Sequence, residues 1–419
     1  MSGLLFLVFI GSAVLAMPIA HALLMAAMAA AATSDRVPVD LLVQQMVSQV
    51  QSFPLIAIPF FMLTGSLMMG GRLGVALVGV LSTLIGRYHG GPAQVGVLSS
   101  TLFGGVSGSA VADASAIGSL LIPWHKRLGY PPAFSAATLA AAATIDILIP
   151  PSIPLILFAL TANASIAALF VAGILPGMLM CGGFMFMCWW VGRRRNFPRD
   201  TTPIVWSAFR THLLYASPAL LLPVLIVLFL RFGIATPTEV AVLSTLYAAV
   251  VSAVFYRDLS WKRLNEAMVS AGLATGVVLL VIMASSAIGW LLTYDQMPSG
   301  IANWVTQNVH EAWLIIFIMN LIMLFVGMFI DLPAAVLLLT PVFLPLAQSI
   351  GMDLTQLGIM MVVNLAIGLY TPPVGTTLFI TSALAKVKVG QTVRELGPFY
   401  LVAFLVLALV SYVPASILH

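Results

Sequence analysis

Three aspartates lie in otherwise apolar sequence, and they are the residues of this chain with the clearest potential for chemistry. Asp113 precedes Pro123 by ten residues, and Asp331 precedes Pro341 by ten. A carboxylate at membrane depth costs about 2.5–3.5 kcal/mol on insertion scales, so each needs a partner. We expect Asp113 and Asp331 either to cap the N-terminus of a helix or to coordinate or gate an ion.

The third aspartate, Asp146, stands one helical turn before the pair Pro150-Pro151, and a second pair occurs at Pro372-Pro373. Because proline has no N–H, carbonyls just before each pair lose their helical partners and suit a hard cation such as sodium. The helix that restarts after each pair presents N–H groups that favour an anion. Asp146 is expected either to form buried hydrogen bonds or to contact a coupling ion or substrate.

Small residues gather around both breaks. Gly104, Gly105 and Gly108 allow close approach of backbones. Any single serine here could simply pack two helices together, but the whole cluster points to a binding site. The side chains that offer hydroxyls are Ser107, Ser109, Ser152, Thr371, Thr376 and Thr377.

The composition excludes a soluble globule, since 61% of the 419 residues are hydrophobic and only 7% are charged, against about a quarter charged in soluble proteins. Apolar segments of roughly 20 residues recur from end to end, so we expect a polytopic membrane protein without a soluble domain. The net charge of +4 comes from short basic clusters between these segments, which does not favour nucleic acid. The first apolar run has no preceding Lys or Arg, so a retained span is preferred to a cleaved signal peptide.

The order of spans follows from this pattern, and the ranges are those expected from the sequence alone. We expect spans at 2–32, 52–71, 166–191, 213–232, 237–256, 271–293 and 396–413, surface amphipathic pieces at 73–88 and 261–268, and a loop at 294–311. Two interrupted hairpins are expected at 91–123, with the exit loop 124–132, and at 312–349. Each is followed by a proline-broken helix, at 133–161 and from 355 onward.

Basic clusters set the expected orientation, because Lys and Arg favour the cytoplasmic side. This rule places the N-terminus in the cytoplasm, both ends of the first hairpin on the cytoplasmic side, and the C-terminus and both ends of the second hairpin on the opposite side. The basic residues used are Arg72, Arg87, Lys126, Arg127, Arg193, Arg194, Arg195, Arg257, Lys262, Arg263, Lys386 and Lys388.

The two interrupted regions match in spacing. Besides the equal Asp-to-Pro intervals, Gly129 precedes the first proline pair by 21 and 22 residues, and Gly351 precedes the second pair by the same distances. Chance placement of prolines is the alternative to a duplicated, inverted unit. Inverted repeats around broken helices are typical of secondary transporters, and no Gly-Lys-Ser/Thr sequence exists from which to write a nucleotide-binding loop.

We therefore expect an all-α polytopic membrane protein with inverted repeats, each containing a re-entrant hairpin and a broken helix, in an elevator-type ion-transporter-like fold. The chain is interpreted as a single transmembrane domain, 1–419. Its parts are first scaffold spans with a surface arm (1–90), a first transport repeat (91–161), scaffold spans and surface helices (162–311), a second transport repeat (312–385) and a last span (386–419).

With these residues in view, the chain resembles the large membrane subunit of TRAP transporters, the tripartite ATP-independent periplasmic family. The resemblance covers nearly the whole chain and is carried by SFPLIAIPFFMLTG (52–65), GGVSGSAVADASAIGSLLIP (104–123), GYPPAFSAA (129–137), IPPSIP (149–154), ALFVAGILPGMLM (168–180) and NLAIGLYTPPVGTTLF (364–379). It implies a sodium-driven importer of the bacterial inner membrane, with two or more sodium ions, and not an enzyme. It also implies a separate small (Q-type) membrane subunit and a periplasmic protein that delivers a small organic anion.

The residues and the resemblance together give two candidate sites. The candidate substrate ligands are Ser107, Gly108, Ser109, Pro151, Ser152, Thr376 and Thr377. The candidate sodium ligands are Gly105, Ser107, Asp113, Asp146, Pro150, Gly327, Asp331, Thr371 and Gly375. One departure stands out: the family commonly has Gly-Pro where this chain has Asp146-Ile147, and the repeat alignment places Gly368 opposite Asp146.

Two other functions compete with this interpretation. A stand-alone sodium–anion symporter or exchanger would share the architecture but need no binding protein. An intramembrane serine protease is suggested by the sequence Gly105-Val106-Ser107-Gly108, but it would need a histidine base near the serine. His21 lies in the first span, before the serine, and four further histidines are expected in loops or at chain ends: His125, His212, His310 and His419.

Overall fold

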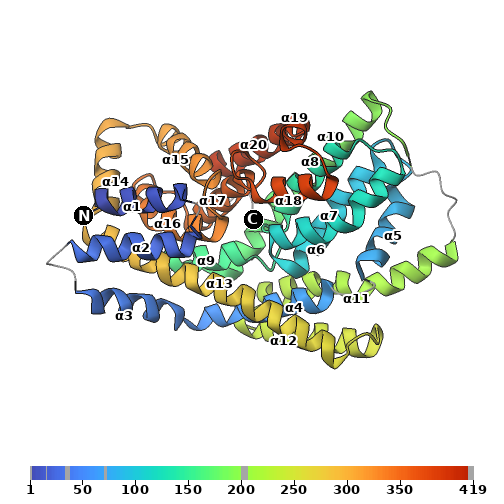
Figure 1. Ribbon diagram of the computed structural model, residues 1–419, viewed down its shortest axis with the longest axis horizontal. Coiled ribbons are helices and arrows are strands. Elements are labelled where there is room, and N and C mark those ends of the chain that lie inside the picture. Colours follow the sequence, from blue (N-terminus) through green and yellow to red (C-terminus); the bar gives the residue numbers. More distant parts are fainter. Residues whose placement is uncertain (1, 16, 34–37, 70–72, 200–205, 414–419) are drawn as a thin grey trace.

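The computed structural model describes residues 2–15, 17–33, 38–69, 73–199 and 206–413 (Figure 1). All regular secondary structure within these ranges is helical, as expected. Five described helices are long and apolar enough to cross a membrane, or up to seven if each of two bent pairs forms one span. The architecture is therefore that of a multi-pass membrane protein. Arg72, used above for orientation, lies outside the described residues.

The N-terminal segment differs from the single span expected at 2–32. It forms two helices, α1 (Ser2–Val14) and α2 (Ile19–Ala32), which fold back on each other (Figure 1). Pro18, at the N-cap of α2, ends the first run because it cannot continue a helical hydrogen-bond ladder. Each helix is about 20 Å long, too short to cross the apolar core alone. The start of α1 and the end of α2 lie at the same end of this hairpin. The prediction of one span over residues 2–32, from which the position of the N-terminus was inferred, is therefore wrong.

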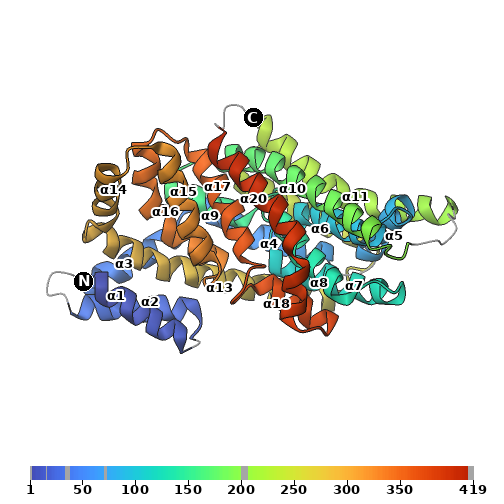
Figure 2. The ribbon, with the colours of Figure 1, turned by 90° about the horizontal axis from the view of Figure 1, so that it is seen from above.

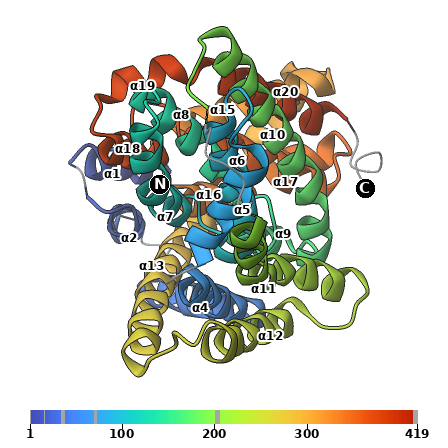
Figure 3. The same cartoon turned by 90° about the vertical axis from the view of Figure 1, so that its right-hand side faces the viewer.

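Three helices gather at one side of the molecule, namely α4 (Ala57–Met69), α12 (Pro237–Val250) and α13 (Trp261–Tyr294), as Figure 3 shows. Helix α13 is continuous, whereas the sequence led us to expect a separate surface piece at 261–268. No proline or glycine interrupts it before Gly272, so the helix passes through the expected boundary. The elements that continue this group are α3 (Val39–Val50), η1 (Phe53–Ile56) and the π-helical turn Val251–Phe255.

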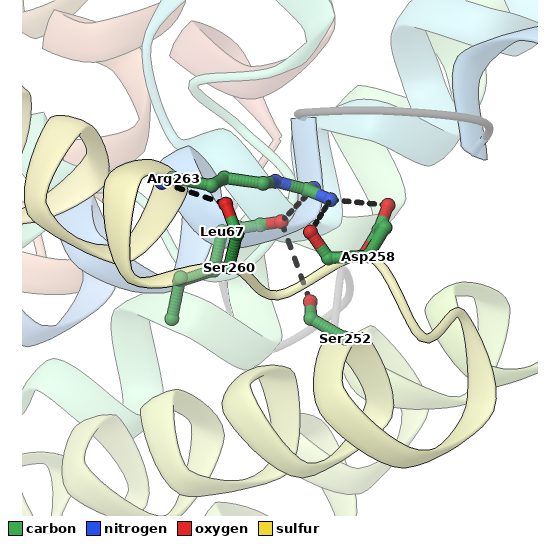
Figure 4. A network of polar contacts seen from close by, with 5 residues as sticks. All are labelled: Leu67, Ser252, Asp258, Ser260 and Arg263. Carbon is green, nitrogen blue, oxygen red and sulfur yellow. Dashed lines mark hydrogen bonds and ion pairs between the residues drawn. The ribbon is translucent and has the colours of Figure 1, made fainter.

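Arg263 joins these helices at one end (Figure 4). Its guanidinium forms an ion pair with Asp258 and donates to the carbonyl oxygen of Leu67 at 2.9 Å. The backbone N–H of Arg263 donates to the hydroxyl of Ser260, the N-cap of α13, at 3.2 Å. The Ser252 hydroxyl also donates to the Leu67 carbonyl, at 3.5 Å. The end of α4, the turn after α12 and the start of α13 therefore share one polar network.

Both expected hairpins and both broken helices are present. The first hairpin has a shorter exit loop than expected, because its second arm continues to Arg127. The first set comprises α6 (Gly91–Ser107), α7 (Ala110–Arg127), α8 (Pro132–Ala142), η2 (Ala143–Ile145) and α9 (Ile153–Ala162). The second comprises α15 (Ala312–Gly327), α16 (Leu332–Ser349), α17 (Leu354–Gly368) and α18 (Thr376–Ala385).

The backbone supports the equivalence of the two sets. Gly129 and Gly351 follow the second arm of each hairpin and both have positive φ, at 76° and 69°, a conformation that glycine adopts without steric cost. The peptide bond within each proline pair is cis. The sets interlock: α18 packs on α7 and α8, and α9 packs on α16 and α17 (Figure 2).

The remaining helices surround this core. The segment 294–311 is not the expected loop but contains a helix that begins with Pro298 in its first turn. These helices are α5 (Leu73–Ile85), α10 (Ile166–Arg194), α11 (Trp206–Arg231), α14 (Met297–Asn308), α19 (Val389–Glu395) and α20 (Gly397–Tyr412). An ion pair of 2.7 Å between Arg195 and Glu395 joins the end of α10 to α19.

In each set, the first hairpin arm crosses the broken helix at a glycine. A Cβ added to Gly104 would lie 2.6 Å from the Asp146 Cα, and a Cβ added to Gly368 would lie 2.9 Å from the Gly327 Cα. Real Cβ atoms do not approach so closely. The two crossings therefore depend on the missing side chains of Gly104 and Gly368.

Replacing Gly368 by alanine should destabilise the protein, because adding a methyl group where the packing leaves no space lowers the free energy of unfolding by about 1–3 kcal/mol. The control is Gly276→Ala in α13, where an added Cβ meets nothing within 4 Å and alanine is favoured by roughly 0.5–1 kcal/mol in a helix. Thermal unfolding of the purified protein in detergent is the measurement. Equal unfolding midpoints for Gly368→Ala and the parent would contradict this packing.

Arg263→Ala should also lower the unfolding midpoint. The variant leaves the Asp258 carboxylate and the Leu67 carbonyl without this donor, and hydrogen bonds to charged groups contribute about 1.5–3 kcal/mol. Lys262→Ala is the matched control, because the Lys262 side chain is 86% exposed and its ion pair with Glu266 spans 3.9 Å. A loss of the same size in both variants would show that the Arg263 network does not hold the helices together.

Candidate functional site

The two hairpin tips meet at one cavity of about 310 Å³. Gly108 and Ser109 line it from the first tip, and Asp331 lines it from the second. The opposite wall comes from α4 and α13, through Met62, Ala274, Val277 and Val278. Sequence reasoning had placed Ser109 and Asp331 in separate repeats, and the fold brings them to the same space.

Asp146 lies directly behind the first tip and is fully buried. One carboxylate oxygen accepts from the Gly108 N–H at 3.0 Å. The other accepts from the Ser109 N–H at 3.0 Å and from the Ser107 hydroxyl at 3.1 Å. Gly108 has φ of +63°, which lets the chain turn so that successive N–H groups point to one acceptor. Of the two roles expected for Asp146, the structure shows the buried hydrogen bonding.

Asp113 has a different environment. It is fully buried in the first turn of α7, and neither carboxylate oxygen accepts a hydrogen bond of regular geometry from the described residues. It is not the cap that we expected as one alternative, because Ser109 holds the N-cap position and its hydroxyl accepts from the Ala112 N–H at 3.5 Å. The buried hydroxyl of Ser100, on the facing arm α6, lies close enough to interact with this carboxyl group but forms no regular hydrogen bond with it.

A buried carboxylate without a partner is costly, and such groups neutralise or bind a cation. Neither Asp113 nor Asp146 takes part in an ion pair of the described residues. The two carboxylates are close enough for their charges to interact. The N–H and hydroxyl donors of the first tip bind the Asp146 carboxylate. Asp113 is therefore the carboxylate of this pair whose charge no hydrogen bond or ion pair of the described residues offsets. Its oxygens and the Ser100 hydroxyl are hard ligands of the kind that a sodium ion takes.

Most hydroxyls proposed as ligands bind the protein's own backbone. Ser152 donates to the Ile147 carbonyl at 2.5 Å, and Thr371 donates to the Ile367 carbonyl at 2.6 Å. Thr377 lies within reach of two carbonyls, those of Leu369 at 2.9 Å and Ala140 at 3.1 Å. These bonds satisfy carbonyls around the helix breaks, as membrane depth demands.

Thr376 differs from its neighbours. Its hydroxyl is buried and has no partner among the described residues. It stands at the start of α18, where the N-cap is Gly375, with φ of 42° and no side-chain cap. Of the predicted hydroxyls beyond the proline pairs, this one is left for a ligand.

In the described part of the chain, the second tip joins its broken helix through a backbone hydrogen bond. The Val374 N–H donates to the Met328 carbonyl at 3.3 Å. Asp331 occupies the N-cap position of α16, as one alternative expected, but its side chain makes no capping bond. Gly327 packs against Leu365 and Gly368, so its own role here is close contact with the broken helix.

The remaining predicted ligands lie beside the first break. Gly105 packs against Pro223 of α11, and a Cβ on it would lie 3.6 Å from the Pro150 carbonyl oxygen. The Pro151 carbonyl lies against Gly108. These three residues therefore pack the first tip between the break and α11.

Several features escaped the sequence reasoning. The cavity wall residues Ala274, Val277 and Val278 are apolar and look like any lipid-facing residue of a span. Helix α4 packs closely on the first tip, where a Cβ on Gly65 would lie 3.3 Å from the Ser107 Cα. In the sequence, this contact is indicated only by the glycine at position 65.

Two histidines also lie elsewhere than expected. His125 and His212 are in helices α7 and α11, not in loops. His125 is fully buried and contacts the Pro92 carbonyl at 2.9 Å. It lies about 22 Å along α7 from the hairpin tip, so it cannot serve Ser107 as a base.

Known proteins share this fold. A crystal structure of the Alcanivorax borkumensis YdaH transporter, described as having an unusual topology, aligns with a TM-score of 0.62 over 89% of this chain and 88% of that one, at 18% identity. At that identity, the similarity concerns the fold.

Sequence relatives are closer. The "Uncharacterized protein y4mL" of Sinorhizobium fredii is 53% identical over the full length of both chains. The 2,3-diketo-L-gulonate TRAP transporter large permease protein YiaN of Escherichia coli is 36% identical, over 98% of this chain and 96% of YiaN. The C4-dicarboxylate TRAP transporter large permease protein DctM of Pseudomonas aeruginosa is 36% identical, over 87% of this chain and 85% of DctM.

The sequence model of one family matches residues 6–416, nearly the whole chain. That family is described as the DctM component of the tripartite ATP-independent periplasmic transporter. The relatives with a stated activity are transport permeases and not enzymes. The chain therefore belongs to the DctM family, the large membrane permeases of TRAP transporters.

Proposed function

We propose that this permease imports a small organic anion by a sodium-coupled, elevator-type mechanism. A periplasmic binding protein delivers the substrate, and a separate small membrane subunit completes the complex, as membership of the family implies. The observation that carries the proposal is the cavity at which both hairpin tips meet two scaffold helices. A ligand there contacts both repeats at once, as alternating access by inverted repeats requires.

The cavity wall supports an elevator-type movement. The tips belong to the interlocked repeats, whereas Met62, Ala274, Val277 and Val278 belong to the group formed by α4 and α13. The side chains on this wall are apolar, so sliding the repeats past them breaks few polar contacts. The Arg263 network holds the scaffold group together at a distance from this surface.

Sodium coupling is supported by the uncompensated carboxylate of Asp113. It lies at membrane depth with Ser100 beside it and without a basic partner, so a monovalent cation would neutralise it. Asp331 at the second tip and the carbonyls before each proline pair are the remaining candidate sodium ligands. We place the substrate in the cavity between the tips. The buried hydroxyl of Thr376 does not line that cavity and is a second group left for a ligand.

The orientation that we propose follows the positive-inside rule. Arg193 to Arg195, Arg257 to Arg263 and Lys386 to Lys388 face the cytoplasm of a bacterial inner membrane. The C-terminal end of α20 then faces the periplasm.

Reconstituted transport tests this proposal. Proteoliposomes containing the permease and its small subunit should accumulate labelled acid only with an inward sodium gradient and a ligand-loaded binding protein. The acids named for the relatives, 2,3-diketo-L-gulonate and a C4-dicarboxylate such as succinate, are the first ligands to test on that binding protein. Equal uptake of free acid without the binding protein would instead support a stand-alone symporter.

Asp113→Asn should weaken the response to sodium. We expect the unfolding midpoint of the parent to rise with sodium but not with choline, and the variant to need at least tenfold more sodium, about 1.4 kcal/mol of lost binding. Glu266→Gln is the control, because Glu266 is 64% exposed on α13 and does not line the cavity between the tips. An unchanged sodium response in Asp113→Asn would remove Asp113 from the sodium site.

A further inference from the structure

The first hairpin tip is built as an anion site. Two consecutive backbone N–H groups, those of Gly108 and Ser109, and the Ser107 hydroxyl converge on one carboxylate within 3.0 to 3.1 Å. Such a concave group of N–H donors at the start of a helix binds phosphate, sulfate or carboxylate in many proteins. Here the carboxylate is the chain's own Asp146, fully buried.

Among the described residues, the second repeat has no carboxylate bound by the N–H groups of its hairpin tip. Gly368, opposite Asp146 in the repeat alignment, has no side chain, and its backbone packs on Gly327. The bond between tip and break also has the opposite direction there, because the tip accepts from the break through the Met328 carbonyl and the Val374 N–H. In the first repeat the tip donates and the break accepts.

We propose that Asp146 is a built-in ligand that occupies an anion site of the first hairpin tip and closes that tip to external anions. The side chain joins the tip to the break by three hydrogen bonds, so the first tip is held to its broken helix. If the transport function proposed above holds, the anionic group of the substrate is bound elsewhere in the cavity, and not by the N–H groups of Gly108 and Ser109.

The site takes a small carboxylate, and its size can be set by mutation. Asp146→Ala removes only the carboxylate and leaves a space the size of formate. Asp146→Gly removes the methylene group as well and leaves a space the size of acetate. Asp146→Asn keeps the space filled and replaces one acceptor oxygen by an NH₂ group, which cannot accept from a backbone N–H.

The test is thermal unfolding of the full-length protein in detergent at constant sodium concentration, with gluconate as the reference anion. We expect all three variants to unfold at lower temperature than the parent. Formate at about 100 mM should recover at least half of the loss in Asp146→Ala, with a gain that grows with concentration as for a specific ligand. Acetate should do so in Asp146→Gly but not in Asp146→Ala. Asp146→Asn and the parent should not respond.

Asp331→Ala is the matched control, because the Asp331 side chain makes no capping bond at the second tip. It should show no recovery with formate. Equal shifts in the parent, in Asp331→Ala and in the Asp146 variants would overturn the proposal, as would no shift in either cavity variant. If neither Asp146→Ala nor Asp146→Gly can be purified, hydrogen exchange of the Gly108 and Ser109 amides in Asp146→Asn is the deciding measurement. Faster exchange than in the parent is expected, and unchanged protection would overturn the proposal.

Uptake separates this inference from the proposed function. Formate should restore uptake by Asp146→Ala, because it refills the tip without entering the substrate site. Competitive inhibition by formate in this variant would overturn the inference, since the substrate anion would then use the same donors. Absence of sodium-dependent uptake by the parent would reject the proposed function but leave the unfolding result intact.

Discussion

The structure depends on one constraint: at membrane depth, every polar group must find its partner within the protein. Two helices are broken by proline pairs, and each break frees carbonyls and N–H groups that lipid cannot satisfy. Ser152 and Thr377 bind freed carbonyls, and Asp146 binds the N–H groups of the first tip. The cluster of small polar residues therefore serves first to make the breaks tolerable.

Of the predicted ligands whose side-chain oxygens are buried, Asp113 and Thr376 remain after these bonds are made. Their side-chain oxygens are buried and have no partner among the described residues. Because unpaired buried polar groups are costly, those retained in a structure call for an explanation. A transported ion or substrate supplies one, since its arrival satisfies groups that the protein alone leaves unpaired. Among the predicted ligands, the groups without partners therefore mark where a ligand is expected.

The two repeats share a backbone plan but differ in how each tip is attached. Both cross their broken helix at a glycine, at Gly104 and at Gly368, because the backbones must come close. Only the first repeat adds a carboxylate behind the tip. The two repeats are therefore alike in spacing but differ in charge. The second tip joins its broken helix through a backbone hydrogen bond, and Asp331 lies at the cavity.

The sequence by itself determined the membrane class, the two hairpins, the two breaks and their equivalence, because proline and glycine act on their immediate neighbours at fixed spacing. It failed at 2–32 and at 261–268, where hydropathy measures apolar length but does not say whether a run folds back or continues. It singled out Asp146 as unusual but left its partner open. That partner lies 37 to 39 residues earlier in the chain, at Ser107 to Ser109. Only the tertiary structure decided this contact and the cavity, because both form where separate helices cross, and no local rule links residues so far apart.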